Sequence, residues 1–401
     1  MKILHIVGGN FKSGAFTGAY ILHKALLNAQ INSKILNDNP NKKPSENDKN
    51  IIFVNTRLIE KVLNKFFIYL EKIFKSIILP NPRSTFTFSI FGYDITKLQA
   101  YKNADIIHIH WLSDGFINLK SISKISKPIV WTMRDMWPFT GGSHYTMEFE
   151  KYEKGYLSNL IKNLKKKTYN KKIQFVAISD WLKFKSKKSN VLKDHSVIKI
   201  YNNIEIDDFK AIPKNFARSK LKIQTDKKII SYGAQNPQST RKGWKIFIDT
   251  LQKIDKSKYF LLIFGSFWSH KILDDLGIEY KSFGFVDNKE KLNLIYSCSD
   301  FFVTTSIQEA FGKTWAEAMA CNIPIVCFKN TASAEIIDHK INGYIVDGFD
   351  SEKLKVGIDW MGNEVDSRNL DIDKIRQKAQ SFDSNKIASE YIDLYLRILK
   401  T

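Results

Sequence analysis

Residues 304–326 read TTSIQEAFGKTWAEAMACNIPIV and combine two short apolar runs with one helical segment. The pattern predicts a buried strand, a loop, a helix that begins near Gly312, and a second strand after Pro324. Glu309 stands in the loop, and Glu317 stands eight residues later in the helix. A carboxylate at the carboxyl end of a strand can accept hydrogen bonds from hydroxyl groups, while the free amides of a helix N-terminus hold phosphate. The stretch therefore predicts a parallel α/β sheet with a ligand site at this edge.

The same alternation of apolar runs and helical periodicity continues in both directions along the chain. The turn-rich stretch 201–213 separates two such series, so we expect domains at 1–200 and 201–380. The last helix has one apolar face, and we expect residues 381–401 to pack back onto the first domain. The expected strands are 2–7, 51–54, 105–110, 129–133, 174–178, 228–231, 260–264, 301–304 and 323–327, and the expected helices are 18–30, 57–79, 119–125, 153–169, 242–254, 289–297, 314–320 and 385–399.

The composition is that of a globular protein, with 43% hydrophobic and 13% aromatic residues among 401, and this excludes global disorder. The three cysteines, Cys298, Cys321 and Cys327, form no CxxC pair. They exclude a disulfide scaffold and a zinc ribbon and suit a reducing cytosol. The N-terminus lacks the pattern of a signal peptide, and no apolar run approaches the roughly 18 residues that span a bilayer. We therefore expect a cytoplasmic protein that is soluble or peripheral to a membrane.

The positive charge is concentrated in the first half of the chain. The net charge is +21, and residues 1–200 contribute 33 Lys and Arg against 14 Asp and Glu, whereas the remainder has 29 against 27. This asymmetry indicates that the first domain faces an anionic partner, for which nucleic acid and an anionic membrane both fit. A solvated lysine-rich surface with no partner is the alternative. No RNP, KH or helix-turn-helix signature supports the nucleic-acid interpretation.

Two glycine-containing segments resemble nucleotide-binding loops without matching them. The segment GGNFKSGAFTG (8–18) follows the first strand, but it is not GxGxxG and no acidic residue follows at the required distance. It is interpreted as a glycine-rich substrate loop or a plain tight turn. The tripeptide Gly312-Lys313-Thr314 ends like a phosphate-binding loop, but the first glycine of that motif would fall at Ile307. A dinucleotide enzyme and an NTPase are therefore not supported.

Several segments together resemble one enzyme family. Glu309-x-Phe311-Gly312 followed by Glu317-Ala-Met-Ala and IPIV is similar to the E-x7-E signature of the family 4 retaining glycosyltransferases, of the bacterial surface-polysaccharide type. Further matches follow in order: WTMRDMWPFTGGSHYT (131–146), FVAISDWL (175–182), residues 201–209 and Arg241-Lys242-Gly243. The resemblance implies the GT-B fold, in which two Rossmann-like parallel-sheet domains face each other across a cleft.

The resemblance also implies a role for individual residues. Glu317 would bind the ribose of a nucleoside-diphosphate sugar, and Glu309 would contact the donor sugar. Arg241 and Lys242 would neutralise the diphosphate leaving group. The remaining implied site residues are Phe311, Gly312 and Lys313 through their amides, Gly14 facing the diphosphate from the other domain, and Asp135 and His110 on the acceptor side. Arg134 stands where relatives carry histidine, Ser143 replaces a cysteine, and Asn203 and Asn322 replace glycines.

The implied reaction is transfer of a hexosyl group to a lipid-linked oligosaccharide or polysaccharide acceptor, as in capsule, O-antigen, lipopolysaccharide or exopolysaccharide synthesis. The resemblance implies no cofactor and no metal. His108 and His110 alternate on a strand, and packed or substrate-facing histidines are favoured there over metal ligands. The tripeptide Asp371-Ile-Asp373 is interpreted as a helix cap. A GT-B-fold sugar-nucleotide epimerase and a basic nucleic-acid-binding protein are the alternative functions.

Residues 57–79 form an amphipathic segment with a half-circle of apolar side chains and lysines opposite. This pattern is typical of a helix at a membrane interface, and it is equally compatible with a core helix. The run KNLKKKTYNKK (162–172) adds six lysines that would attract anionic lipid. We expect an enzyme that is peripheral on the cytoplasmic face of the inner membrane, with no nucleic-acid partner.

Overall fold

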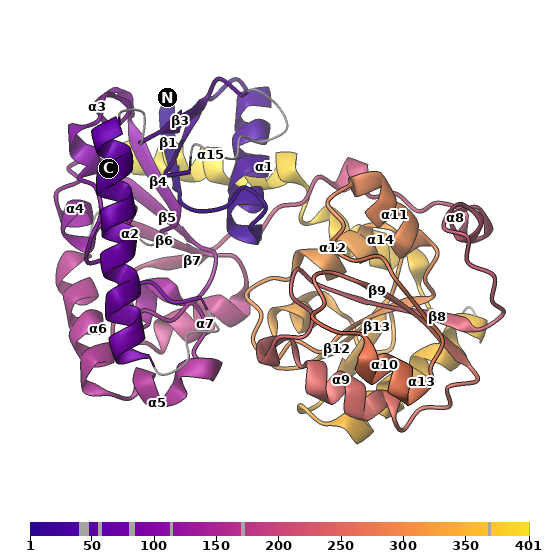
Figure 1. The fold of residues 1–401 in the computed structure, drawn as a ribbon. Coiled ribbons are helices and arrows are strands. Elements are labelled where there is room, and N and C mark those ends of the chain that lie inside the picture. Colours follow the sequence, from indigo (N-terminus) through magenta and orange to yellow (C-terminus); the bar gives the residue numbers. More distant parts are fainter. Residues whose placement is uncertain are drawn as a thin grey trace. The chain divides into compact units, whose positions relative to one another are not determined.

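The computed structural model describes residues 1–39, 48–54, 58–79, 85–112, 115–169, 173–367 and 370–400, and it divides into two units. Unit 1 comprises Met1–Asn203 together with Ser384–Thr401, and unit 2 comprises Ile204–Asp383. Each unit is built on one parallel β-sheet with helices packed against it (Figure 1). The prediction of two Rossmann-like parallel-sheet domains is confirmed.

The sheet of unit 1 has the strand order β3-β2-β1-β4-β5-β6-β7, and all of its paired strands are parallel. Its central strands are apolar runs with both faces buried, as expected for a sheet covered by helices. The strands are β1 Lys2–Val7, β2 Asn32–Asn37, β3 Ile51–Phe53, β4 Ile106–Trp111, β5 Ile129–Met133, β6 Ile173–Ala177 and β7 Val197–Lys199. The helices are α1 Gly14–Asn28, α2 Leu58–Ile78, α3 Gln99–Asn103, α4 Leu119–Ser123, α5 Glu150–Glu153, α6 Tyr156–Thr168, α7 Asp180–Lys187 and α15 Ser384–Lys400.

The sheet of unit 2 has the order β10-β9-β8-β11-β12-β13 and is also parallel. The first strand of this series, β8, lies between β9 and β11, so the strand order reverses there. Ligands of open α/β sheets bind at this switch point, outside the carboxyl ends of the strands. The strands are β8 Lys228–Gly233, β9 Tyr259–Phe264, β10 Tyr280–Ser282, β11 Phe301–Thr304, β12 Ile325–Phe328 and β13 Gly343–Val346. The helices are α8 Lys214–Lys220, α9 Trp244–Leu251, α10 Lys271–Leu276, α11 Lys289–Ser297, α12 Lys313–Ala320, α13 Ser351–Ser367 and α14 Ile372–Gln380.

The C-terminal helix α15 is part of unit 1 although it follows the whole of unit 2 in sequence (Figure 1). Its apolar face, which includes Ile387 and Leu394, packs in one core cluster with Ile3 and Leu22. Two tyrosines on the same face make buried hydrogen bonds to the sheet, Tyr391 with Thr132 at 2.7 Å and Tyr395 with His108 at 2.6 Å. A helix of period 3.6 can thus bury both apolar and hydrogen-bonded side chains along one stripe.

Helix α2 does not bury its apolar face in a core. Leu58, Ile59, Val62, Phe66 and Ile77 are 53–78% exposed. The helix is held from its other side by Glu71, which is fully buried and accepts hydrogen bonds from the amides of Phe88 and Ile90. The Glu71 carboxylate thus ties α2 to two backbone amides of the segment that follows it. No helix within the described ranges is long and apolar enough to cross a membrane.

Candidate functional site

The carboxyl ends of β8 and β11 meet the N-terminus of α12 in a small recess of unit 2. This is the switch point of the sheet, where the topology places a ligand site. Four predicted site residues come together in or beside the recess: Arg241, Lys242, Glu309 and Gly312. The other lining residues are Tyr232, Gly233, Ala234, Val303, Thr304, Thr305, Ser306, Thr314 and Trp315.

A buried carboxylate and two cations form the charged centre of the recess. The Nζ of Lys242 donates to Oε2 of Glu309, and NH1 of Arg241 lies 3.5 Å from the same oxygen. Burial would raise the pKa of Glu309, but Lys242 and Arg241 outweigh it and lower that pKa to about 2. Burial lowers the pKa of Lys242, and Glu309 opposes this effect. The recess thus carries more cationic than anionic groups and can accept an anion.

The turn that carries the two cations is joined to the loop that carries Glu309. Oγ1 of Thr305 donates to the Lys242 carbonyl at 2.7 Å, and the Ile307 amide donates to the Arg241 carbonyl at 2.8 Å. The turn ends at Gly243 with φ 68°, where a Cβ would collide with the carbonyl oxygen of Thr305. Glycine is therefore required at this close approach. Gly243 lets the Arg241-Lys242-Gly243 turn pack closely against the loop at Thr305. This packing brings Lys242 into contact with Glu309.

The N-terminus of α12 opens toward the same place. Gly312 has φ 83° and precedes the helix, and it has no side chain to cap the first amides. Free amides and the helix dipole favour an anion at this position. Phe311 is buried against Trp315 and Phe382, so its side chain supports the loop and only its backbone is available to a ligand.

Glu317 lies one turn into α12 and is 4% exposed. Its Oε2 accepts a hydrogen bond from the Tyr296 hydroxyl at 2.9 Å, and its Oε1 lies 3.2 Å from Nζ of Lys313. The pair Lys313–Glu317 has i,i+4 spacing and was visible in the sequence. Tyr296 was missed, because nothing in its local pattern shows that α11 brings its hydroxyl to α12.

In unit 1, Asp135 follows β5 and is the centre of a second polar cluster. Its carboxylate accepts from the Trp137 amide at 2.9 Å, from Nε1 of Trp111 at 3.1 Å and from Nδ1 of His144 at 2.7 Å. A consistent assignment has a proton on Nδ1 of His144, while its Nε2 accepts from Thr87 at 3.1 Å. His144 was not among the predicted site residues, although it lies within the motif 131–146.

His110 is 2% exposed, and both of its ring nitrogens are used within unit 1. Its Nε2 lies 2.8 Å from Nδ1 of His5, and its Nδ1 lies 3.1 Å from NH2 of Arg134. Burial, His108 and Arg134 lower the pKa of His110 well below its usual value. Arg134 donates onward to Asn202. The structure therefore places His110 inside a buried hydrogen-bond network of unit 1.

Among the described residues, His5, His108 and His110 form the one group of three candidate metal ligands, with their ligand atoms within 4.8 Å of one another. The two ring nitrogens of His108 already bond Tyr395 and Thr132. The guanidinium of Arg134 beside His110 would repel a cation. The donor set therefore fits a neutral hydrogen-bond network better than a metal site. Asp371 caps α14 by accepting from the Lys374 amide, as predicted.

Gly14 is the first residue of α1, whose N-cap is Ser13. A Cβ on Gly14 would meet no atom within 4 Å, so the residue borders open space. Its neighbour Gly18 is different, because a Cβ there would collide with Arg134. The first glycine leaves the N-terminus of α1 accessible, and the second allows close packing.

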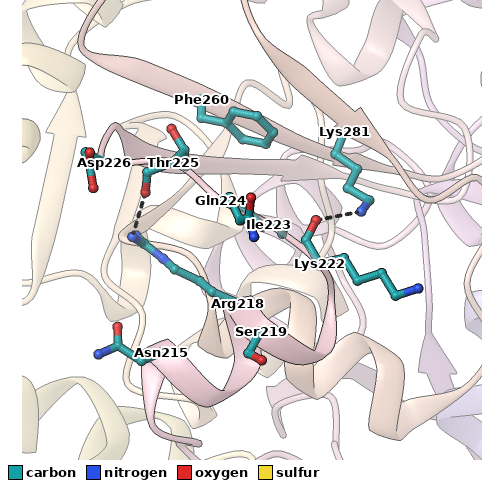
Figure 2. A pocket seen from close by; sticks show the side chains of 10 residues that line it. All are labelled: Asn215, Arg218, Ser219, Lys222, Ile223, Gln224, Thr225, Asp226, Phe260 and Lys281. Atoms are coloured by element: carbon teal, nitrogen blue, oxygen red, sulfur yellow. Dashed lines mark hydrogen bonds between the residues drawn. The ribbon is translucent and has the colours of Figure 1, made fainter.

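A larger cavity of about 880 Å³ lies elsewhere on unit 2, between α8, the turn that follows it and strands β9 and β10 (Figure 2). Two cationic side chains that line this cavity are already bonded within unit 2. Arg218 donates to Asp300 at 2.9 Å, and Lys281 donates to the Leu221 carbonyl at 2.7 Å. None of the predicted site residues lines it. The recess at β8 and β11, where predicted residues come together, is therefore the candidate functional site.

Residues 213–378 match the family described as Glycosyl transferases group 1, and this range lies within unit 2. The chain is also 29% identical over 189 residues to an uncharacterized glycosyltransferase, MJ1607, of Methanocaldococcus jannaschii. That match covers 45% of this chain and 47% of the relative, so the chain spans about half the length of this curated relative. Residues 213–378, which carry the recess, are thus similar to the group 1 glycosyltransferases.

Solved structures resemble the whole chain at low sequence identity. A glycosyltransferase from Rickettsia africae ESF-5 has a TM-score of 0.69 at 18% identity, covering 100% of this chain and 99% of that one. Anabaena Alr3699/HepE in complex with UDP-glucose has 0.68 at 16%, covering 99% and 100%. WaaG, a glycosyltransferase involved in lipopolysaccharide biosynthesis, has 0.65 at 13%, covering 98% and 99%. The fold is therefore GT-B, as predicted.

The charged centre makes a testable contribution to stability. Glu309→Gln should lower the free energy of unfolding at pH 7 by about 2–3 kcal/mol, because Lys242 and Arg241 lose their counter-charge. The pKa of Glu309 is lower in the folded chain than in the unfolded chain. The wild-type advantage should therefore be complete above about pH 4.5 and disappear as the pH falls toward 2.

Urea denaturation of the full chain at several pH values measures this difference. The matched control is Glu352→Gln, which removes an exposed partner of Lys253 and should cost no more than about 0.5 kcal/mol. Equal stabilities of wild type and Glu309→Gln at pH 7 would show that the pair is not stabilising.

Proposed function

We propose that this chain is a retaining glycosyltransferase that transfers a hexosyl group from a nucleoside-diphosphate sugar to a lipid-linked oligosaccharide or polysaccharide. One observation carries the proposal: Lys242 and Arg241 converge with Glu309 beside the uncapped N-terminus of α12. These groups lie within the residues that match the group 1 glycosyltransferases. Two cations and free helix amides suit a diphosphate, and carboxylates suit sugar hydroxyls.

In the proposed reaction the bond between the anomeric carbon and the diphosphate oxygen breaks while the acceptor oxygen bonds to the same face of the sugar. The acceptor hydroxyl proton passes to the departing diphosphate, which leaves with the bonding electron pair. Negative charge grows on the diphosphate in the transition state, so Lys242 and Arg241 act where stabilisation accelerates the reaction. Glu309 contacts the donor sugar and Glu317 the ribose. The UDP-glucose bound to Alr3699/HepE supports a donor of this class.

On unit 1 we assign the acceptor contact to Asp135. His144, Trp111 and the Trp137 amide hold its carboxylate, which is 11% exposed and retains acceptor capacity for a substrate hydroxyl. His110 supports this region through Arg134 and the buried network, without a contact of its own. A lipid-linked acceptor is supported by the surface of unit 1 and by the fold shared with WaaG.

The surface of unit 1 combines exposed apolar side chains with lysines. Besides α2, helix α6 exposes Tyr156, Leu157, Leu160 and Leu164, by 41–76%. The two helices adjoin one apolar cluster, which contains Leu79 and Ile161 and against which Ile78 packs. Exposed lysines on the two helices are Lys61, Lys65, Lys72, Lys166 and Lys167. We propose that this surface, named the α2/α6 surface, binds the anionic cytoplasmic face of a membrane.

The lysine run 162–172 contributes less to this surface than its sequence indicated. Lys165 is fully buried, donates to the carbonyls of Trp137 and Thr140, and lies 3.5 Å above the Trp137 ring centroid. Lys162 pairs with the buried Glu153 at 2.9 Å. Lys165 therefore fixes α6 to the loop after β5, and Lys162 fixes it to α5. Residues 170–172 lie outside the described residues.

The two glutamates should separate binding from turnover. Glu317→Ala should weaken nucleotide-sugar binding, because ribose contacts persist in ground and transition states, whereas Glu309→Ala should mainly lower kcat. Steady-state kinetics and donor titration of both variants measure the split, with Glu352→Gln as control. Full activity in both variants would remove the site assignment. Release of an altered free nucleotide sugar without any acceptor would instead identify an epimerase.

Divalent metal should be dispensable for transfer. Arg241, Lys242 and the amides of α12 supply positive charge at the place where a metal-dependent enzyme would use a cation. Transfer by the full chain should keep its rate in excess EDTA. Loss of activity in EDTA that magnesium or manganese restores would contradict this expectation.

The α2/α6 surface should bind vesicles that contain phosphatidylglycerol, and binding should weaken as salt shortens the Debye length from about 10 Å at 0.1 M to about 3 Å at 1 M. The triple substitution Ile59→Ser, Val62→Ser and Phe66→Ser should reduce binding at least about tenfold, because each side chain contributes apolar burial. Phe67 and Phe74 stay unchanged, since they pack on Tyr93 and Phe91.

Vesicle co-sedimentation measures this binding, and circular dichroism verifies that the triple variant folds. The matched control, Phe216→Ser with Trp268→Ser and Val356→Ser, removes equally exposed apolar side chains from unit 2 and should bind as wild type does. Undiminished binding of the α2 variant would show that this surface is not the membrane contact.

A further inference from the structure

Tyr296 is a fully buried tyrosine in the last turn of α11, and its ring lies among aromatic side chains of unit 2. The ring centroids of Phe264, Phe209 and Phe302 lie 5.7, 6.0 and 6.2 Å from its own. In such surroundings a hydroxyl group is costly unless it finds a hydrogen-bond partner. Its partner is Oε2 of Glu317, at 2.9 Å.

The geometry makes this hydroxyl a donor to the carboxylate. Burial and the nearby Glu317 raise the pKa of Tyr296 well above its usual value, so the phenol keeps its proton throughout the neutral range. The protonated phenol therefore donates a hydrogen bond to the Glu317 carboxylate. The hydrogen bond is charge-assisted and is shielded from water by the aromatic ring cluster.

Glu317 is thus held from two directions. Tyr296 bonds Oε2 from the protein interior, and Lys313, which is 24% exposed, lies 3.2 Å from Oε1 at the first turn of α12. An ionised carboxylate has about four lone-pair positions, so two donors fix its plane and leave acceptor capacity for a pair of neighbouring hydroxyls. A free glutamate on a helix would rotate about its side-chain bonds and lose that orientation on most occasions.

We propose that Tyr296 is a positioning residue, which orients the carboxylate of Glu317 so that it accepts hydrogen bonds from both ribose hydroxyls of the donor nucleotide. The inference rests on the proposed function. According to this proposal, the Tyr296 phenol determines how well the site distinguishes ribonucleotides from nucleotides that lack these hydroxyls. The phenol is buried and touches neither sugar nor phosphate.

The test compares a ribonucleoside diphosphate with its 2′,3′-dideoxy analogue, using the base that stabilises the wild-type chain most among UDP, GDP and ADP. Isothermal titration gives the Kd of both ligands for wild type, Tyr296→Phe and the control Tyr259→Phe. The control removes a phenol that bonds Asp359 at 3.4 Å, outside the proposed site. Tyr296→Phe should weaken ribonucleotide binding about tenfold and leave dideoxynucleotide binding unchanged.

Kinetics provide a second measurement. Tyr296→Phe should raise the KM for the donor and leave kcat at saturation within about twofold, because the ribose is remote from the reacting bond. In the background of Glu317→Ala, adding Tyr296→Phe should have no further effect on ribonucleotide binding, since the group that the phenol orients is gone. Lys313→Met should reproduce the ribose-specific loss and serves as the second variant if Tyr296→Phe does not fold.

Three results would overturn the inference, and they differ from one another. If wild type binds no nucleoside diphosphate, the proposed function fails together with it. If wild type binds both nucleotides equally, the assignment of Glu317 to ribose fails. If wild type discriminates but Tyr296→Phe discriminates as strongly, or loses both ligands equally, the phenol has only a structural role and the proposed function stands.

Discussion

The charge cluster of Glu309 with Lys242 and Arg241 is the interaction on which the site in unit 2 depends. A nearly buried carboxylate stays ionised there because two cations outweigh its desolvation. The same contact joins the turn after β8 to the loop after β11, with backbone hydrogen bonds and a close approach at Gly243 on either side of it. Stability of the recess and its capacity to receive an anion therefore have one physical origin.

The two units share one sheet topology, but they use their polar side chains differently. In unit 2 the carboxyl edge of the sheet collects charges that can meet a ligand. In unit 1 the ring nitrogens of His108 and His110 are taken up by other protein groups, and burial lowers the pKa values of both histidines. Helix α15 belongs to that network through Tyr391 and Tyr395, so the last residues of the chain help to hold the strands that carry Asp135.

Buried polar side chains decide which surfaces are left for partners. Glu71 secures α2 from beneath, and this leaves Ile59, Val62 and Phe66 facing outward. Lys165 and Lys162 likewise hold α6 in place through Trp137 and Glu153, and Leu160 and Leu164 of that helix stay exposed. In both helices a charged side chain with a buried partner holds the helix in place, and apolar side chains of the same helix stay exposed.

The sequence by itself determined the α/β class and the strand–loop–helix unit around Glu309 and Glu317, because apolar periodicity and glycine positions are local properties of a chain. It missed the strands β2, β7, β10 and β13, whose pairing comes from their neighbours in the sheet. Only the tertiary structure joined Tyr296 to Glu317 and His144 to Asp135, buried Lys165, and exposed α2. Each of these outcomes depends on which distant segment supplies a partner to a polar group, and local sequence does not contain that information.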